Sequence, residues 1–107
     1  MKVSFHPEAE EEFKAAIEYY EEKGVGLGYD FAIEVYETIK RSTAFPKAWP
    51  IIEADIRRSL VRRFPFGVLY SEYHQEIHIV AVMNLHREPD YWKHRTGKDT
   101  LPDNADI

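Results

Sequence analysis

The sequence contains no cysteine among its 107 residues. This absence excludes disulfide bonds, zinc sites built on thiolates and cysteine nucleophiles, and it is natural in a reducing compartment. No apolar run approaches the roughly 20 residues that a membrane helix requires. The first seven residues also lack the apolar stretch of a secretory signal. We therefore expect a cytoplasmic protein without a membrane segment.

Signals for metals and nucleotides are also weak. The histidines at positions 6, 74 and 78 lack the spacing with acidic residues that a metal site needs. Residues 24–28 alternate glycine with apolar residues, but they lack the Lys-Ser/Thr pair of a Walker phosphate loop. No apolar strand leads directly into them, so a connection between two helices explains this segment better. We expect no metal and no cofactor.

A strongly basic composition is missing as well, because the net charge is −5. This acidity argues against nonspecific binding of nucleic acids. The charge is unevenly distributed: residues 1–55 hold six Lys/Arg against twelve Asp/Glu, whereas residues 56–98 hold eight against four. The field at a site depends on nearby charges more than on the total. The second half of the chain can therefore still carry a local cationic surface.

The sequence does contain a clear order of elements. Residues 2–6 alternate apolar and polar side chains, as a short strand does. Pro7 and the acidic residues after it begin a helix that ends near Gly24. The elements expected after it are a helix over residues 29–42 and strands over residues 56–64, 68–73 and 76–83. The short connections predict an antiparallel helical hairpin and an antiparallel meander.

The apolar spacing predicts one core, built from Phe13, Ile17, Phe31, Val35, Ile79 and Val82. Strict alternation in the last strand places Ile77, Ile79, Ala81 and Met83 on one face and Val80 and Val82 on the other. A strand that is apolar on both faces is central and at least partly covered on both sides. Residues 1–98 are expected to form one domain, and the acidic tail at residues 99–107 is expected to be mobile.

Four arginines occur as two adjacent pairs at positions 57, 58, 62 and 63. Neighbours on a strand point to opposite faces, so Arg57 would share a face with Arg63, or Arg58 with Arg62. Two guanidinium groups on one face could follow a phosphate backbone. They could equally keep an exposed strand soluble or pair with the acidic helices. Both interpretations remain open from the sequence.

The run from Asn84 to Arg95 holds the densest chemistry, with two histidines, two arginines, a tyrosine and a tryptophan in twelve residues. His86 could transfer a proton, and Arg87 could neutralise a phosphorane-like transition state. The phenol of Tyr91 could orient a reacting group or donate a proton to it. Cleavage of RNA through its own 2′-hydroxyl needs these roles and no metal. Each residue also has a structural interpretation: Trp92 is more often a core residue than a platform for a base.

This order of elements resembles the RelE/ParE superfamily of toxins from type II toxin–antitoxin modules, which includes the plasmid stabilisation family. The residues that carry the resemblance are Ala9 within Pro-Glu-Ala-Glu-Glu-Glu-Phe13, Ile17-Glu-Tyr-Tyr20, Pro46, Arg57, Phe64-Pro-Phe66 with Tyr70, and Arg87-Glu-Pro-Asp-Tyr-Trp92 with Arg95. The resemblance implies an α+β fold in which an N-terminal strand and an antiparallel two-helix hairpin pack on a mostly antiparallel sheet. The implied order is β-α-α-β-β-β with a short C-terminal helix.

The resemblance leaves three functions open. ParE-like members inhibit DNA gyrase, and the long helical hairpin favours this function. RelE-like members are ribosome-dependent endoribonucleases that cut mRNA; this function would make Arg87, His86 and Tyr91 catalytic. The residues expected to bind RNA or another target are Arg57, Arg63, Trp92 and Arg95. The third alternative is a degenerate, inactive member that only binds an antitoxin or regulates, because Asn84 stands where many relatives of this subgroup carry histidine.

The implied partners follow from the same resemblance. A cognate antitoxin protein would neutralise the toxin by laying a helix or a strand across its apolar and basic surface. The target would be DNA gyrase, or the ribosome with its mRNA. No membrane partner is expected, and DNA would be contacted only through the complex with the antitoxin.

Overall fold

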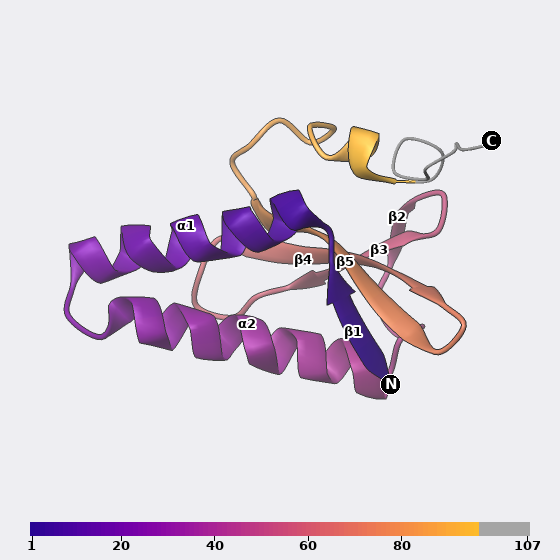
Figure 1. Ribbon diagram of the computed structural model, residues 1–107, viewed down its shortest axis with the longest axis horizontal. Coiled ribbons are helices and arrows are strands. Elements are labelled where there is room, and N and C mark those ends of the chain that lie inside the picture. Colours follow the sequence, from indigo (N-terminus) through magenta and orange to yellow (C-terminus); the bar gives the residue numbers. More distant parts are fainter. Residues whose placement is uncertain (97–107) are drawn as a thin grey trace.

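The computed structural model describes residues 1–96, so the expected tail at 99–107 and the last two residues of the expected domain lie outside the described residues. The elements in chain order are β1 (Lys2–Phe5), α1 (Pro7–Lys23), α2 (Leu27–Ala44), β2 (Ile51–Glu53), β3 (Ile56–Leu60), β4 (Phe66–Tyr73), β5 (Glu76–Asn84) and the single 3₁₀ turn η1 (Lys93–Arg95) (Figure 1). Within residues 1–96, no helix combines the length and apolar character needed to cross a bilayer.

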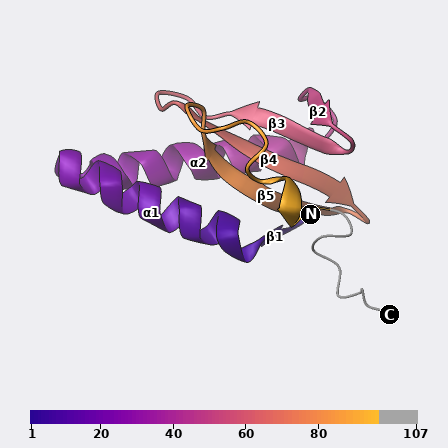
Figure 2. The ribbon, with the colours of Figure 1, turned by 90° about the horizontal axis from the view of Figure 1, so that it is seen from above.

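The five strands form one sheet in the order β1-β5-β4-β3-β2. Only β1 runs parallel to its neighbour, β5; the other pairs are antiparallel. The α1–α2 hairpin packs on one face of the sheet and extends past its edge as an arm (Figures 1 and 2). The segment after β5 returns across the other face (Figure 2). The α+β fold expected from the sequence is confirmed, with β2 as one additional short strand.

Local hydrogen bonds set the ends of the helices. The His6 Nδ1 accepts the Glu8 N–H at 3.1 Å and caps α1, which Pro7 begins. The Glu21 carboxylate, near the end of α1, accepts the N–H groups of Gly26 and Gly28, both at 3.0 Å. A carboxylate from one helix thus satisfies free donors at the start of the next. This contact makes the connection between the helices tight.

The core between the hairpin and the sheet is largely aromatic. The Phe31 ring lies 5.2 Å from Phe64 and 4.9 Å from Phe66 between centroids, both edge-on, and Tyr20 lies 4.8 Å from Phe64. Such edge-to-face pairs add to the free energy gained by burial. The six core residues expected from the sequence are confirmed: five are buried in one cluster, and Ile17 packs against it partly exposed.

A β-bulge in β5 changes the expected alternation of the strand. The pairing steps from Tyr70 with Ile79 to Leu69 with Ala81, which leaves Val80 as the extra residue. The expected alternation is therefore wrong beyond the bulge. An inserted residue reverses which side chains face the helices, because side chains on a strand have a period of two.

Two clusters result from this reversal. After the bulge, Val82 joins the core under the helices, whereas Ala81 and Met83 turn to the opposite face of the sheet. There they pack with Ile56 and with Trp92 from the returning segment. The strand is central and covered on both faces, as expected.

Strand β3 is shorter than expected and ends at Leu60. The Val61 N–H donates to the carbonyl of Phe66, and Arg63 has a φ of 71°, so the chain turns over residues 61–65 instead of continuing as a strand. This turn places Phe64 in the core. The expectation that Arg57 shares a strand face with Arg63 is therefore wrong.

The two helices approach most closely at Gly28. A Cβ at this position would lie 2.6 Å from the carbonyl oxygen of Ile17 in α1. Alanine normally stabilises a helix relative to glycine by about 1 kcal/mol. At position 28 the collision with a backbone atom should outweigh that gain, since overpacking costs roughly 1–3 kcal/mol.

We therefore predict that Gly28→Ala lowers the free energy of unfolding by about 1–2 kcal/mol, measured by urea denaturation. The matched control is Gly24→Ala, where an added Cβ would meet nothing nearer than 3.9 Å. The control should change stability by less than about 0.5 kcal/mol. A Gly28→Ala variant as stable as the natural chain would contradict the close helix contact.

Candidate functional site

A cavity of about 420 Å³ lies between α1, the start of β4, the end of β5 and the loop after it. All three expected catalytic residues, His86, Arg87 and Tyr91, line it together. Its other walls are mainly apolar and include Ala15, Ala16, Tyr19, Tyr20, Phe66 and Val82. The structure therefore brings the expected catalytic residues to one place, on a surface that can also hold an apolar side chain.

Tyr91 lies between two guanidinium groups. The Cζ of Arg87 is 3.7 Å from the centre of the ring, and that of Arg95 is 5.0 Å away. The Tyr91 hydroxyl is buried and has no hydrogen-bond partner among the described residues. Burial raises the pKa of Tyr91, and the nearby Glu12 carboxylate raises it further. The phenol is therefore protonated at neutral pH and a weak acid.

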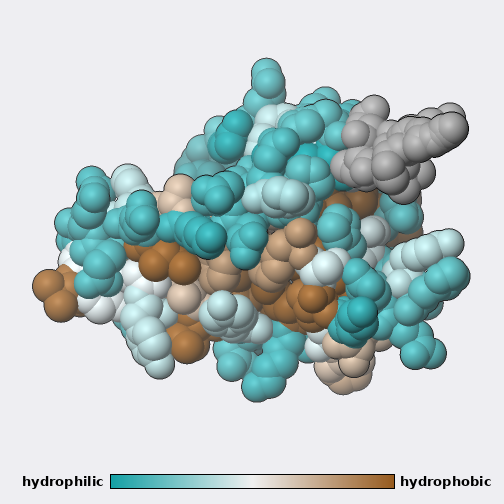
Figure 3. Space-filling model, in the orientation of Figure 1, coloured by the Kyte–Doolittle hydropathy of each residue, from teal (hydrophilic) through white to brown (hydrophobic). Residues whose placement is uncertain are grey.

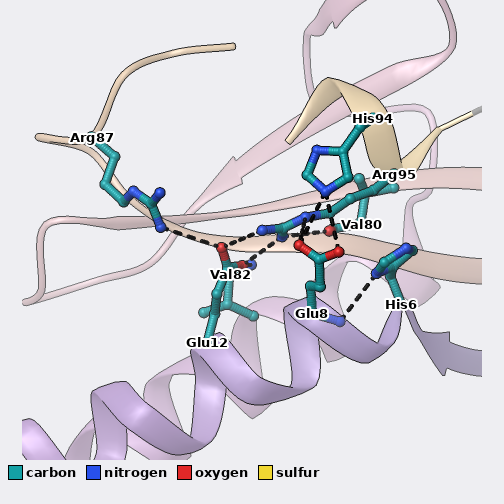
Figure 4. Close-up of polar contacts among 8 residues, drawn as sticks. All are labelled: His6, Glu8, Glu12, Val80, Val82, Arg87, His94 and Arg95. Carbon is teal, nitrogen blue, oxygen red and sulfur yellow. Dashed lines mark hydrogen bonds and ion pairs between the residues drawn. The ribbon is translucent and has the colours of Figure 1, made fainter. Parts of the chain in front are cut away.

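Glu12 of α1 is the centre of the polar contacts beside this cavity (Figure 4). Its Oε1 accepts two hydrogen bonds, from the Val82 N–H at 3.0 Å and from Nη1 of Arg95 at 2.9 Å. Its Oε2 accepts a third, from Nη2 of Arg95 at 2.9 Å. Nη1 of Arg87 lies 3.8 Å from the same Oε2. Two parallel bonds between a guanidinium and a carboxylate form the strongest kind of ion pair in proteins.

Arg95 is almost fully enclosed, with 4% of its side chain exposed. Besides the two bonds to Glu12, its Nη1 donates to the carbonyl of Val80 at 3.2 Å, and its Nε lies 3.4 Å from Oε1 of Glu8. Burial alone would lower the pKa of Arg95, but the bonds and charge of Glu12 outweigh it and raise the pKa. The guanidinium that the sequence suggested for target binding is bound internally.

A second polar contact connects the same segment to α1. The Glu8 carboxylate lies 3.0 and 3.1 Å from Nε2 of His94. The hydrogen bond with His94 lowers the pKa of Glu8. Burial lowers the pKa of His6, whose ring caps the helix beside this pair (Figure 4). The returning segment is therefore fastened to the first two turns of α1 by two carboxylates.

The other expected target-binding residues lie elsewhere. Nη1 of Arg57 donates to the carbonyls of Lys47 and Trp49, at 3.2 and 2.7 Å, and so braces the crossing after α2. Arg63 lies 3.7 and 3.8 Å from two carboxylates of α2 and over the ring of Phe64. Trp92 is 2% exposed on the opposite face of the sheet, where it acts in packing.

His86 remains accessible. Its side chain is exposed at the rim of the cavity, and its backbone N–H donates to Oδ1 of Asn84 at 2.9 Å. Asn84 therefore shapes the turn after β5 instead of supplying a proton. Of the residues considered for proton transfer, His86 alone combines an exposed ring with a place in this cavity.

Glu12 is not among the site residues expected from the sequence. The acidic residues at the start of α1 were all attributed to the helix dipole, although Glu12 lies three residues after Ala9 and four before Ala16, next to the apolar stripe. The available signal was an acid beside a buried stripe, together with an arginine shortly after the aromatic pair Tyr91-Trp92. Within residues 1–96, no group of three histidine or acidic side chains has an arrangement that could hold a metal ion.

Comparisons with known proteins support the fold only. No family model matches the sequence, and no curated protein matches it. Among solved structures, the chain is similar to one described as "Chromosomal ParDE TA system from P. aeruginosa", with a TM-score of 0.68 and 16% sequence identity. The match covers 80% of this chain and 97% of that one. The fold is therefore one found in a ParDE toxin–antitoxin system.

The geometry around Glu12 predicts a large effect of a small substitution. Glu12→Gln keeps the shape of the side chain but removes the carboxylate that pairs twice with the enclosed Arg95 guanidinium, which leaves it only the mostly exposed Glu8 carboxylate as a countercharge. Breaking a buried pair in this way costs about 3–5 kcal/mol. We expect a loss of this size in urea denaturation. Glu11→Gln, an exposed neighbour, should be nearly neutral. Equal stability of the two variants would contradict the role assigned to Glu12.

Proposed function

We propose that this protein is the toxin of a type II toxin–antitoxin module and that it stops growth by binding DNA gyrase. A cognate antitoxin would neutralise it in the cytoplasm, and DNA would be contacted only through their complex. The likeness in fold to a chain from a ParDE toxin–antitoxin system supports the general class. The resemblance of its sequence to the RelE/ParE superfamily is the reason for proposing the same class.

One observation favours a toxin that acts by binding its target without cutting RNA: the arginines expected to bind a target already have partners within the protein. Arg57 is held by backbone carbonyls, Arg63 by α2 carboxylates, and Arg95 by Glu12. An enzyme that cuts RNA needs cations free to meet phosphates. The three arginines expected to bind a target are thus engaged within the protein, and together with the net charge of −5 this fits a protein target better than a polyanion.

A ribonuclease acting on ribosome-bound mRNA is the second candidate. Its support is the joint placement of His86, Arg87 and Tyr91 on one cavity. In this function His86 would transfer the proton, and Arg87, with half of its side chain exposed, would neutralise the charge that develops on the phosphate. Tyr91 would position Arg87 through its ring.

The front of the molecule carries an apolar surface. Figure 3 shows apolar side chains between α1 and α2 and onward to β1. Val3, Ile33 and Tyr36, which lie on β1 and α2, are 40%, 40% and 56% exposed. Exposed apolar side chains that form a continuous patch indicate a protein interface. This surface supports the proposal of an antitoxin partner.

Growth and enzyme assays test the proposal. Induced expression should arrest growth, and co-expression of the small protein encoded beside this one should restore it. The purified protein should inhibit supercoiling by DNA gyrase and leave ribosome-bound mRNA intact. Normal growth at high, verified levels of soluble protein would support the degenerate alternative.

Two substitutions separate the candidates. In a ribonuclease, Arg87→Ala should lower the cleavage rate by about 10²–10³, the loss seen when one preorganised donor to the transition state is removed. In a gyrase inhibitor, Tyr91→Phe should retain supercoiling inhibition, because the hydroxyl has no hydrogen-bond partner among the described residues. Circular dichroism must show that both variants fold. A folded Arg87→Ala variant with lost mRNA cleavage would reject the gyrase proposal.

A further inference from the structure

The face of the sheet opposite the helices is closed over only part of its length. Beyond the bulge in β5, Trp92 and the residues packed with it cover this face. Before the bulge, a cavity of about 650 Å³ lies over β4 and β5, and its walls include Asp55, Ile56, Tyr73, Glu76, His78 and Val80. Within residues 1–96 it shares no lining residue with the cavity beside Glu12. It is therefore separate from the site described above.

Strand pairing brings three polar side chains together beside this cavity. Ile77 and Ile79 belong to the core under the helices. Their neighbours Glu76 and His78 therefore point to the opposite face of the sheet. In the parallel pairing of β1 with β5, Ser4 is the direct neighbour of His78. The Ser4 hydroxyl donates to Oε2 of Glu76 at 2.6 Å, and its oxygen lies 2.8 Å from Nδ1 of His78. The serine thus joins a carboxylate to an imidazole.

The number of protons in this chain of contacts sets the state of the imidazole. A serine hydroxyl has one proton, and Ser4 donates it to the Glu76 carboxylate. The proton between Ser4 and His78 therefore comes from Nδ1 of the ring. In the neutral imidazole the lone pair is then on Nε2. Nε2 makes no hydrogen bond with any residue in the described part of the chain, and His78 lines the cavity. The site thus holds an oriented acceptor that the protein leaves unused.

The charges around the cavity favour a cationic ligand. Its walls include the carboxylates of Glu76 and of Asp55, which lies in the turn between β2 and β3. Neither forms an ion pair within residues 1–96. Among the described residues, Arg95 is the one lysine or arginine of the lining, and the carboxylates of Glu12 and Glu8 balance its charge. Two acidic groups outside ion pairs make the cavity unsuitable for a phosphate or another anion.

The rest of the lining suits a flat apolar body. Ile56 and Val80 are 2% and 1% exposed, and they supply apolar surface next to the polar groups. Tyr73 is exposed, and its ring stacks on that of His74 at 3.9 Å between centroids. Small-molecule sites in proteins commonly combine a mostly apolar lining with a few polar groups that fix the orientation of the ligand. This cavity has both features.

We propose that this cavity binds a small organic cation that carries an amidinium or guanidinium group on an apolar body. One N–H of the cation donates to Nε2 of His78, and the carboxylates of Glu76 and Asp55 stabilise its positive charge. The apolar body packs on the buried aliphatic side chains beside them. Ser4 and Glu76 are also positioning residues, since they hold the proton of His78 on Nδ1 and so keep Nε2 an acceptor. The inference does not depend on the proposed function, because it rests on other residues.

Benzamidine, a flat aromatic amidinium, is the probe for this site. It is titrated into the isotope-labelled full chain at about pH 8, where a histidine is ordinarily neutral, and binding is followed by NMR. We expect saturable binding with the largest shifts at Ile56, His78 and Val80. His78→Phe should weaken binding about tenfold or more, the size of one charge-assisted hydrogen bond, and Asp55→Asn about threefold. The matched control Asp90→Asn, an exposed aspartate outside this cavity, should leave the affinity unchanged.

The ring nitrogens of His78 test the positioning role directly. Their chemical shifts should show the proton on Nδ1 in the unliganded chain and a hydrogen bond at Nε2 when benzamidine binds. Ser4→Ala removes the contact that fixes this tautomer, so the proton should move in part to Nε2. The affinity should then fall in proportion to the lost acceptor population. Ser4→Thr keeps the hydroxyl and should retain both the tautomer and the affinity. A role of Ser4 in stability alone would leave the tautomer unchanged.

The results that overturn the proposal are distinct. Benzoate has the shape of benzamidine and the opposite charge, so tighter binding of benzoate would show an anion site. Benzamidine that does not bind saturably, or that binds equally well to His78→Phe and Asp55→Asn, would reject this cavity. A proton on Nε2 of His78 in the unliganded chain would reject the assigned chain of hydrogen bonds. Circular dichroism must show that each variant folds; if His78→Phe does not, the comparison of Ser4→Ala with Ser4→Thr decides.

Discussion

The buried pair between Glu12 and Arg95 is the contact on which the rest of the structure depends. Strand β1 ends where the His6 N–H meets the carbonyl of Ile79, but β5 continues for five more residues. Beyond that point the open edge of β5 would leave a buried carbonyl at Val80 and a buried N–H at Val82, each costing about 1–3 kcal/mol if unsatisfied. Arg95 donates to the first and Glu12 accepts from the second, so the ion pair replaces a missing strand.

The bulge at Val80 and this ion pair occur at the same point of β5. The extra residue lets β5 pair with β4 on both sides of the bulge while the strand presents a different face to the helices. It also coincides with the place where α1 takes over from β1 as the neighbour of β5. Trp92 then secures the returning segment on the opposite face. A residue near the end of the chain therefore stabilises the first helix, and the arginine that does so is unavailable for a ligand.

The sequence predicted the parts of this fold that rest on periodicity. The two helices, four of the five strands and the core around Phe31 follow from apolar spacing, which a short stretch of chain encodes; the short strand β2 was not predicted. The bulge does not follow from apolar spacing, because Val80 and Ala81 are as apolar as their neighbours. Only the pairing with β4 shows the shift in register. The turn at Arg63 was also missed, since a positive φ at a residue other than glycine has no local signal. Glu12 was missed because its partner lies 83 residues away.

The contacts explain part of the uneven distribution of charge along the chain. Acidic residues of the helices compensate cations of the second half one by one: Glu12 pairs with Arg95, and α2 carboxylates face Arg63. What remains uncompensated is therefore more informative than the total. Where carboxylates are absent, at the edge of β3, the cations still to be neutralised gather beside an open backbone. An acidic protein thus keeps a group of arginines without carboxylate neighbours in one cavity at the place where its sheet is incomplete.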